Sequence, residues 1–148
     1  MVDVNQGWGF EDAIIYPKQL ESSKVKWVEE SISSDISNNK INELANYSNC
    51  NLAFGENITN IYDFINISHN LKIKFFQPDI IKFGGISLIN ELKNKIDSNK
   101  IWLHFLGGGV GLVASAHLQS SINNQAFLEM DINNNPLREN IFKEKSNH

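Results

Sequence analysis

The chain has 148 residues, of which 41% are hydrophobic and 20% charged, and this is the length and composition of one ordinary globular domain. Its formal net charge of −4 argues against nucleic acid as a partner, and no apolar run approaches the roughly 18 residues that span a bilayer. The N-terminus lacks the pattern of a signal peptide, and the single cysteine, Cys50, fits a reducing cytoplasm.

Short apolar runs alternate along the chain with stretches of helical spacing. The predicted strands are residues 25–28, 52–55, a segment within 73–83, 101–104 and 127–128. The predicted helices are residues 10–20, which Pro17 should kink or end, 41–47, 58–67 with Asn57 as its N-cap, 87–96 and 110–121. This alternation implies a parallel sheet, because each parallel pairing needs a crossover.

Ionisable residues recur at or near the ends of the apolar runs. They are Asp3, Glu29, Glu56, Asp79, His104 and Glu129, separated by 26, 27, 23, 25 and 25 residues. A single acid at such a place is more often a helix N-cap or a solvated loop residue, but six in phase are hard to explain as caps. Six consecutive strand ends do not converge in a doubly wound sheet, whereas in a barrel they meet at one mouth. We therefore predict an incomplete (β/α) barrel over residues 1–131, followed by a polar C-terminal tail over 132–148.

Three carboxylates, Asp3, Glu29 and Glu56, follow successive strands and offer only oxygen ligands. That donor set suits Mg²⁺, which prefers octahedral oxygen coordination, and no neighbouring cysteine or histidine points to zinc. Glu30 competes with Glu29 for the ligand role, and only one of two adjacent strand residues can face the barrel interior.

The motifs around these residues resemble the mandelate racemase branch of the enolase superfamily, over nearly the whole chain. The matching segments are Asp3-Val4-Asn5-Gln6-Gly7-Trp8, Trp27-Val28-Glu29-Glu30, Gly55-Glu56-Asn57, Gln77-Pro78-Asp79 through Gly84-Gly85-Ile86, His104-Phe105-Leu106-Gly107-Gly108-Gly109, Ala116-His117-Leu118, Leu128-Glu129-Met130-Asp131 and Asn135-Pro136-Leu137-Arg138-Glu139. Ser31 departs from the family, which usually has proline after the paired glutamates.

The resemblance implies a (β/α)8 barrel of which this chain holds the end of strand 3 through strand 8. It also implies Mg²⁺-dependent removal of the proton α to a carboxylate through an enediolate. Asp3, Glu29 and Glu56 match the metal ligands. His104 and Asp79 match the catalytic His–Asp dyad, and Glu129 matches the acid that hydrogen-bonds the substrate carboxylate.

Asp79 separates the branches of the family, because muconate-lactonizing and dipeptide-epimerising relatives carry a catalytic lysine at that place. An acid at position 79 together with His104 favours the mandelate racemase-like branch. The expected substrate is a small carboxylate, an acid sugar or a hydroxy acid, and the expected reaction is dehydration or racemisation.

Two further hypotheses stay open beside this one. Strands 1 and 2 and the family's capping domain are not in the sequence, so the chain could be a truncated, catalytically inactive remnant that binds metal or self-associates. An open parallel edge near residues 25–28 would then favour a homo-oligomer. A weaker alternative is a phosphate site at the glycine loop, residues 107–111, which leaves the three carboxylates unexplained.

Overall fold

The computed structural model describes residues 1–20, 24–70, 72–123 and 125–141. Strands and helices alternate along it. They are β1 (Val2–Asp3), α1 (Phe10–Leu20), β2 (Val28–Glu29), α2 (Asn38–Tyr47), β3 (Leu52–Phe54), α3 (Ile61–Ser68), β4 (Ile73–Phe76), α4 (Ile86–Leu92), the 3-10 helix η2 (Ser98–Lys100), α5 (Gly109–Ile122) and α6 (Pro136–Glu139). The predicted α/β alternation is confirmed.

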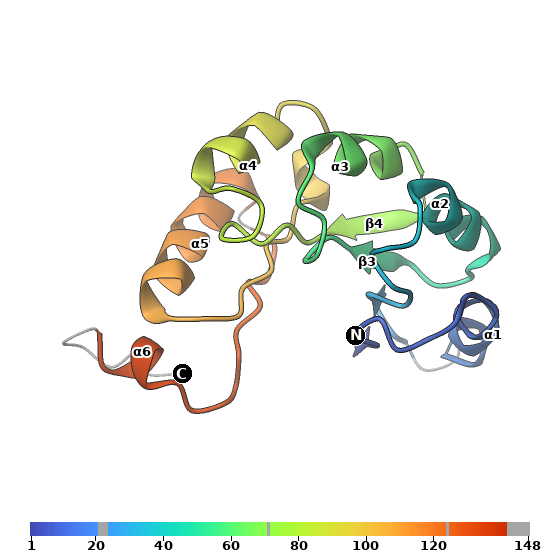
Figure 1. Cartoon of the computed structure of the whole chain (residues 1–148), viewed down its shortest axis with the longest axis horizontal. Helices are drawn as coiled ribbons and strands as arrows, with labels where there is room; N and C mark the ends of the chain where they lie inside the picture. Colours follow the sequence, from blue (N-terminus) through green and yellow to red (C-terminus); the bar gives the residue numbers. More distant parts are fainter. Residues whose placement is uncertain (21–23, 71, 124, 142–148) are drawn as a thin grey trace.

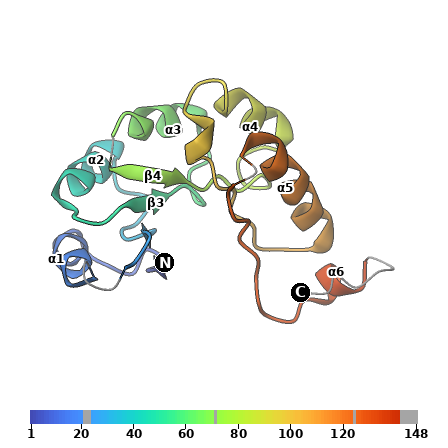
Figure 2. The same ribbon diagram turned by 180° about the vertical axis from the view of Figure 1, so that it is seen from behind.

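The four strands form one parallel sheet in the order of the sequence, β1-β2-β3-β4. Asp3 aligns with Glu29, and Glu29 aligns with Ala53, so the ends of the first three strands lie at one edge. Figures 1 and 2 show an arc in which α2, α3 and α4 cover the outer side and the strands line the inner side. A sequential strand order with helices on one side differs from a doubly wound sheet, where the order reverses.

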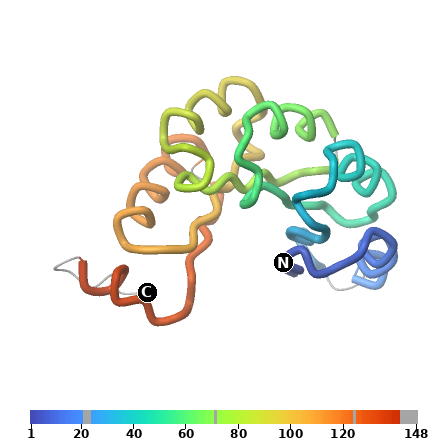
Figure 3. Tube along the Cα trace, viewed as in Figure 1, coloured from blue at the N-terminus to red at the C-terminus, as the bar shows by residue number. Residues whose placement is uncertain are grey.

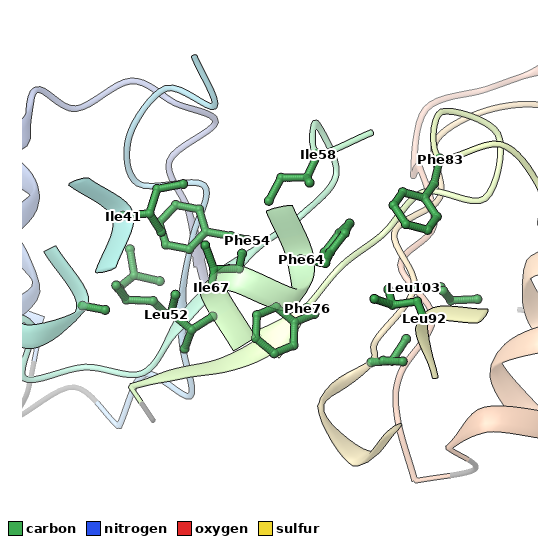
Figure 4. Packing of buried hydrophobic residues seen from close by; sticks show 14 of the residues in the cluster. Ile41, Leu52, Phe54, Ile58, Phe64, Ile67, Phe76, Phe83, Leu92 and Leu103 are labelled. Atoms are coloured by element: carbon green, nitrogen blue, oxygen red, sulfur yellow. The ribbon is translucent and has the colours of Figure 1, made fainter. Parts of the chain in front are cut away.

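The two faces of the sheet bury different residues. The helix-facing side holds the main core, which includes Val28, Leu52, Phe54, Phe64 and Phe76, and Figure 4 shows this packing between sheet and helices. The inner side holds a smaller aromatic cluster made by Trp27, Ala53, Phe75, Ala126 and Trp102. Because strand residues alternate between faces, Trp27 and Phe75 mark the residues that point inward.

Several helix boundaries differ from the prediction: α2 begins at Asn38 rather than at residue 41, and α4 ends at Leu92 rather than at residue 96. The third helix begins at Ile61, and its N-cap is Asn60, whose side chain accepts a hydrogen bond from the Tyr62 N–H. Asn57, predicted as the cap, instead donates to Glu56 Oε1 at 2.8 Å. Helix α1 continues through Pro17 to Leu20 and is not ended there, although a proline removes one backbone donor and crowds the carbonyl four residues earlier.

The last two predicted strands do not form ladders within the described residues. Residues 101–104 make only isolated bridges, Phe76 with Ile101 and Asp79 with His104, and residues 127–128 are not a strand. For residues 127–128, the Gln119 side chain contributes to this, since its Oε1 accepts from Leu103 N–H at 2.6 Å and its Nε2 donates to Ile101 C=O at 3.1 Å. These are the backbone groups that a neighbouring strand would otherwise use.

The C-terminal segment is more ordered than a polar tail suggests, up to residue 141. Asn135 caps α6, which packs against α5, and the tube in Figure 3 shows this helix beyond α5 at the end of the arc. Arg138 is buried and donates to the carbonyls of Asp131 and Asn133. Residues 142–148 of the predicted tail lie outside the described residues. Within the described ranges, no helix combines the length and apolar character that crossing a membrane requires.

Candidate active site at the strand ends

The predicted site residues follow the strands at one edge of the sheet. Asp3 and Glu29 end β1 and β2, Glu56 and Asp79 come shortly after β3 and β4, and His104 forms a parallel bridge with Asp79. Parallel strands place their carboxyl ends at the same edge, so the sequence spacing brings these side chains to one end of the sheet.

His104 and Asp79 form a buried pair. Both are 2% exposed, and His104 Nδ1 lies 2.9 Å from Asp79 Oδ2, which is the hydrogen-bonding distance that the dyad requires. The other Asp79 oxygen accepts from the backbone N–H of Ile81 at 2.7 Å and of Lys82 at 3.2 Å. The carboxylate is therefore fixed by the chain that follows it, and it orients the imidazole.

The second imidazole nitrogen faces two further acids. His104 Nε2 lies 2.8 Å from Glu56 Oε2 and 3.9 Å from Glu129 Oε1. The contact between Glu56 and His104 does not follow from the sequence, which assigns Glu56 to the metal. Nε2 is thus the nitrogen that opens toward the cluster of acids, while Nδ1 is used by Asp79.

Lys82 is a site residue that the sequence analysis did not single out. Its Nζ lies 3.9 Å from Glu56 Oε1 and donates to Asn57 Oδ1 at 3.3 Å. The available signal was its position three residues after Asp79, in the first turn beyond the strand end. Lys82 and His104 together give Glu56 two cationic neighbours.

These contacts set the charge of the dyad. Burial lowers the pKa of His104, but hydrogen bonds to Asp79 and Glu56 and the charges of Glu129 and Glu56 outweigh it and raise that pKa to about 10. The hydrogen bond to His104 lowers the pKa of Glu56. Burial raises the pKa of Asp79, but hydrogen bonds from His104 and from the backbone N–H groups of Lys82 and Ile81 outweigh burial, so that this pKa lies below its usual value. At neutral pH His104 is therefore an imidazolium between two carboxylates.

Glu129 has the opposite character. The pKa of Glu129 is raised to about 7, mainly by burial. The charge of His104 opposes this rise, and the charges of Glu29, Glu56 and Asp3 add to it. A carboxyl group with a pKa near neutrality is protonated in part and can donate a hydrogen bond. This suits the role that the family resemblance gives Glu129.

The side chains of the neighbouring residues Glu29 and Glu30 accept hydrogen bonds from different parts of the chain. Glu29 Oε2 accepts from Trp27 Nε1 at 2.8 Å, and Trp27 belongs to the inner aromatic cluster. Glu30 has a φ of 41°, and its Oε1 accepts from Gly55 N–H at 2.8 Å. Of the two, Glu29 lies on the inner face, whereas Glu30 ties the end of β2 to the end of β3.

The three predicted metal ligands are not drawn together around one point. Asp3 is exposed and aligned with Glu29, while Glu56 turns to His104, and no three His, Cys, Asp or Glu side chains of the described residues are spaced to hold an ion. The donor chemistry still fits a hard cation, because all three side chains offer carboxylate oxygens. Their shared role as ligands stays a prediction.

Glu30 makes the stability of the chain depend on pH. Burial is the main cause that raises its pKa from 4.5 to about 7, and the Gly55 N–H acts against it. A raised pKa favours the folded state while the group is protonated, so this contribution is complete below pH 4.5 and is lost between there and about pH 7.

We therefore expect Glu30→Gln, which keeps an acceptor for Gly55, to gain stability relative to the natural chain as the pH rises from 4 to 8. The free energy of unfolding in urea is measured for the variant and for the natural chain at pH 4 and at pH 8. The difference between the two proteins should increase between these pH values by on the order of 3 kcal/mol. Glu43→Gln, on the exposed face of α2, controls for the loss of one negative charge. A gain that is equal at pH 4 and pH 8 would contradict the assignment.

Comparison with known proteins places this chain in a family. All of it, residues 1–148, matches the Enolase C-terminal domain-like family. The chain belongs to this family, and its fold and strand-end acids agree with that membership. The α/β parallel sheet, the resemblance to mandelate racemase-like enzymes and the enolase superfamily assignment are thereby confirmed.

Particular relatives share a part of their length with this chain. It is 28% identical over 145 residues to an arabinonate dehydratase of Saccharolobus solfataricus, covering 97% of this chain and 38% of that protein. A mandelate racemase/muconate lactonizing enzyme from Bordetella bronchiseptica RB50 superposes with a TM-score of 0.77 at 31% identity, over 92% of this chain and 39% of that one.

A racemase from Streptomyces coelicolor with bound magnesium superposes with a TM-score of 0.64 at 26% identity, covering 78% of this chain and 35% of that structure. The chain thus spans less than two fifths of the length of each of these three proteins.

Proposed function

We propose that this chain carries the proton-transfer site of a Mg²⁺-dependent enzyme that removes the proton α to a carboxylate, in a protein whose sheet continues into a complete (β/α) barrel. The observation that carries the proposal is His104, which is buried and held between Asp79 at Nδ1 and Glu56 at Nε2, with Glu129 also near Nε2. Isolated histidines at strand ends are usually structural, but a buried histidine surrounded by three acids is typical of sites where protons are transferred.

Acid-sugar dehydration is the reaction that we favour. The similarity to an arabinonate dehydratase supports a polyhydroxy acid as substrate. The chemistry also suits His104, because one imidazole can take the α-proton at Nε2 and then give it to the β-hydroxyl, which leaves as water. The products are an enol and water, and His104 returns to its starting state. Racemisation of a hydroxy acid is the alternative: it shares the first of these transfers and then needs a proton returned to the opposite face of the α-carbon by a second acid.

The remaining site residues orient His104 and stabilise the bound substrate and the enediolate. Asp79 holds Nδ1 of His104, so that Nε2 is presented to substrate. Protonated Glu129 would donate a hydrogen bond to a carboxylate oxygen of the substrate. Asp3, Glu29 and Glu56 would hold Mg²⁺, which when bound supplies positive charge to the enediolate oxygens. The magnesium bound by the Streptomyces coelicolor racemase supports that choice of ion.

The metal and His104 compete for the same carboxylate, and this gives a direct test. In the present arrangement Glu56 helps to raise the pKa of His104 to about 10, and such a histidine cannot accept a proton at neutral pH. Because a cation at Glu56 would offset the charge of that carboxylate, we expect Mg²⁺ to lower the pKa of His104 by at least about one unit.

The measurement is an NMR titration of the His104 ring signals, with and without saturating Mg²⁺. Glu56→Gln should lower the His104 pKa without metal and should abolish the response to Mg²⁺. A His104 pKa that Mg²⁺ leaves unchanged in the natural chain would remove Glu56 from the ligand set and with it the proposed metal site.

A second candidate function is self-association without turnover. The open edge lies at β1 and not near residues 25–28 as predicted, because β2 pairs with both β1 and β3. Among the described residues, β1 has no partner strand on its other side. Unpaired edges of parallel sheets are templates for another chain. We expect light scattering at micromolar concentration to give a mass of at least two chains that falls on dilution. A cooperative monomer at all concentrations would rule this candidate out.

A further inference from the structure

A chain of three contacts joins Lys82 to His104 across the ends of β3 and β4. Lys82 Nζ donates to Asn57 Oδ1 at 3.3 Å, and Asn57 Nδ2 donates to Glu56 Oε1 at 2.8 Å. The other Glu56 oxygen, Oε2, lies 2.8 Å from His104 Nε2. Both oxygens of Glu56 are therefore engaged by the protein, one by the Asn57 amide and one by the imidazole.

Lys82 contacts two acids of the site with different parts of its structure. Its backbone N–H donates to Asp79 Oδ1 at 3.2 Å, in the turn that follows β4. Its side chain extends to the residues after β3, where it meets Asn57 and comes within 3.9 Å of Glu56 Oε1. A change of the Lys82 side chain can therefore alter Glu56 while the backbone contact that fixes Asp79 stays in place.

The Asn57 amide suits a place between a cation and a carboxylate. An amide offers an acceptor oxygen and a donor NH2 group, so it can accept from the Lys82 ammonium and donate to Glu56 at the same time. The reverse orientation would place the NH2 group against the ammonium and the oxygen against the carboxylate, and both contacts would be repulsive. Lys82 Nζ itself is 3.9 Å from Glu56 Oε1, which is too far for a hydrogen bond. Lys82 thus fixes the orientation of the amide, and the amide holds the carboxylate.

This arrangement opposes the binding of a cation at Glu56. Asp3 aligns with Glu29 at the ends of β1 and β2, whereas Glu56 turns to His104, and the part of the chain that the structure describes brings no three such side chains around one point. To bind a cation, the Glu56 carboxylate must give up at least one of its two present contacts. The Lys82 ammonium, 3.9 Å from that carboxylate, also repels a second positive charge.

We infer that Lys82 is a positioning residue for Glu56. Acting through Asn57, it holds the Glu56 carboxylate against His104 and thereby weakens the binding of Mg²⁺ at this carboxylate. The inference rests on the proposed function, in which Glu56 is a metal ligand. Lys82 therefore sets the Mg²⁺ concentration at which Glu56 leaves its present contacts.

The first test is the affinity for Mg²⁺, measured by isothermal titration calorimetry on the natural chain and its Lys82 variants. Lys82→Met should bind Mg²⁺ about three- to fivefold more tightly, the effect expected when one partly exposed charged contact is lost. Lys82→Arg should bind like the natural chain, because it keeps the charge and the N–H donors. An affinity that Lys82→Met leaves unchanged or weakens would overturn the inference.

Lys40→Met controls for the loss of one positive charge. Lys40 is an exposed residue of α2 that pairs with Glu43 and has no contact with the site, so its replacement should leave the affinity for Mg²⁺ unchanged. If Lys40→Met tightens binding as much as Lys82→Met does, net charge explains the effect and the inference is overturned.

The second test shows whether Lys82 acts through Asn57 or only through its charge. Asn57→Ala should tighten Mg²⁺ binding by itself, and in the Asn57→Ala background Lys82→Met should change the affinity by less than about twofold. The titrations are run in about 0.5 M KCl, where interactions between exposed charges are largely screened. A Lys82→Met effect that is equally large with and without Asn57 would overturn the inference.

The same titrations separate the inference from the proposed function. Mg²⁺ that shifts the His104 ring signals but binds the natural chain and Lys82→Met equally well would remove the role of Lys82 and leave the proposed function standing. If Mg²⁺ binds neither the natural chain nor any of the variants, the proposed metal site and the inference both fail.

Discussion

Replacing His104 with asparagine should lower the rate of α-proton exchange by about 100- to 10,000-fold, the usual contribution of a general base or acid. Asparagine keeps a polar side chain beside Asp79 but cannot take or return a proton. The measurement is the incorporation of solvent deuterium at the α-carbon of an acid sugar. It uses a protein that includes the remaining length of the relatives, because this chain spans 38% of the arabinonate dehydratase.

His117→Asn is the matched control, since His117 lies exposed on α5 and has no part in the proposed mechanism. Mg²⁺ binding should survive in both variants, because neither histidine is a proposed ligand. Exchange that continues at the natural rate in His104→Asn would assign the base to another residue.

Gly55→Ala should be the most destabilising of the glycine substitutions in this chain, at about 3 kcal/mol or more. The φ of Gly55 is 144°, and an added Cβ would lie 2.8 Å from the backbone nitrogen of Gln77 and 2.8 Å from the Phe64 ring. Neither neighbour can move freely, because Gln77 N–H is bonded to Phe54 C=O and Phe64 is fully buried. The turn that carries Glu56 would be displaced with it.

Two other glycines separate backbone strain from the clash. Gly85 has a φ of 93° but open space around its Cα, whereas Gly9 has open space and no positive φ. In urea unfolding, Gly85→Ala should cost about 1 kcal/mol and Gly9→Ala much less. A Gly55→Ala variant no less stable than Gly85→Ala would mean that β3 and β4 can separate at that point.

The alternation of apolar runs predicted β2, β3 and β4 and helices α1 to α5, because the residues that a repeating βα unit buries recur along the sequence with a regular period. Boundaries were less well predicted. Asn57 and Asn60 are both suitable helix caps, and only the packing of the β3–α3 loop decides that Asn60 caps α3 while Asn57 turns to Glu56. Residues 127–128 have the composition of a strand, but a ladder depends on a partner with free backbone groups, and Gln119 already bonds those of Ile101 and Leu103.

By itself the sequence determined the family, the α/β parallel fold and the end of the sheet at which Asp79, His104 and Glu129 gather, since spacing along parallel strands fixes which residues reach a common edge. Only the tertiary structure decided what each of those side chains contacts. Spacing does not reveal that Glu56 lies 2.8 Å from His104 Nε2 or that Gln77 Oε1 is buried without a partner among the described residues. Rotamers and burial set these contacts, and both depend on packing against residues far away along the chain.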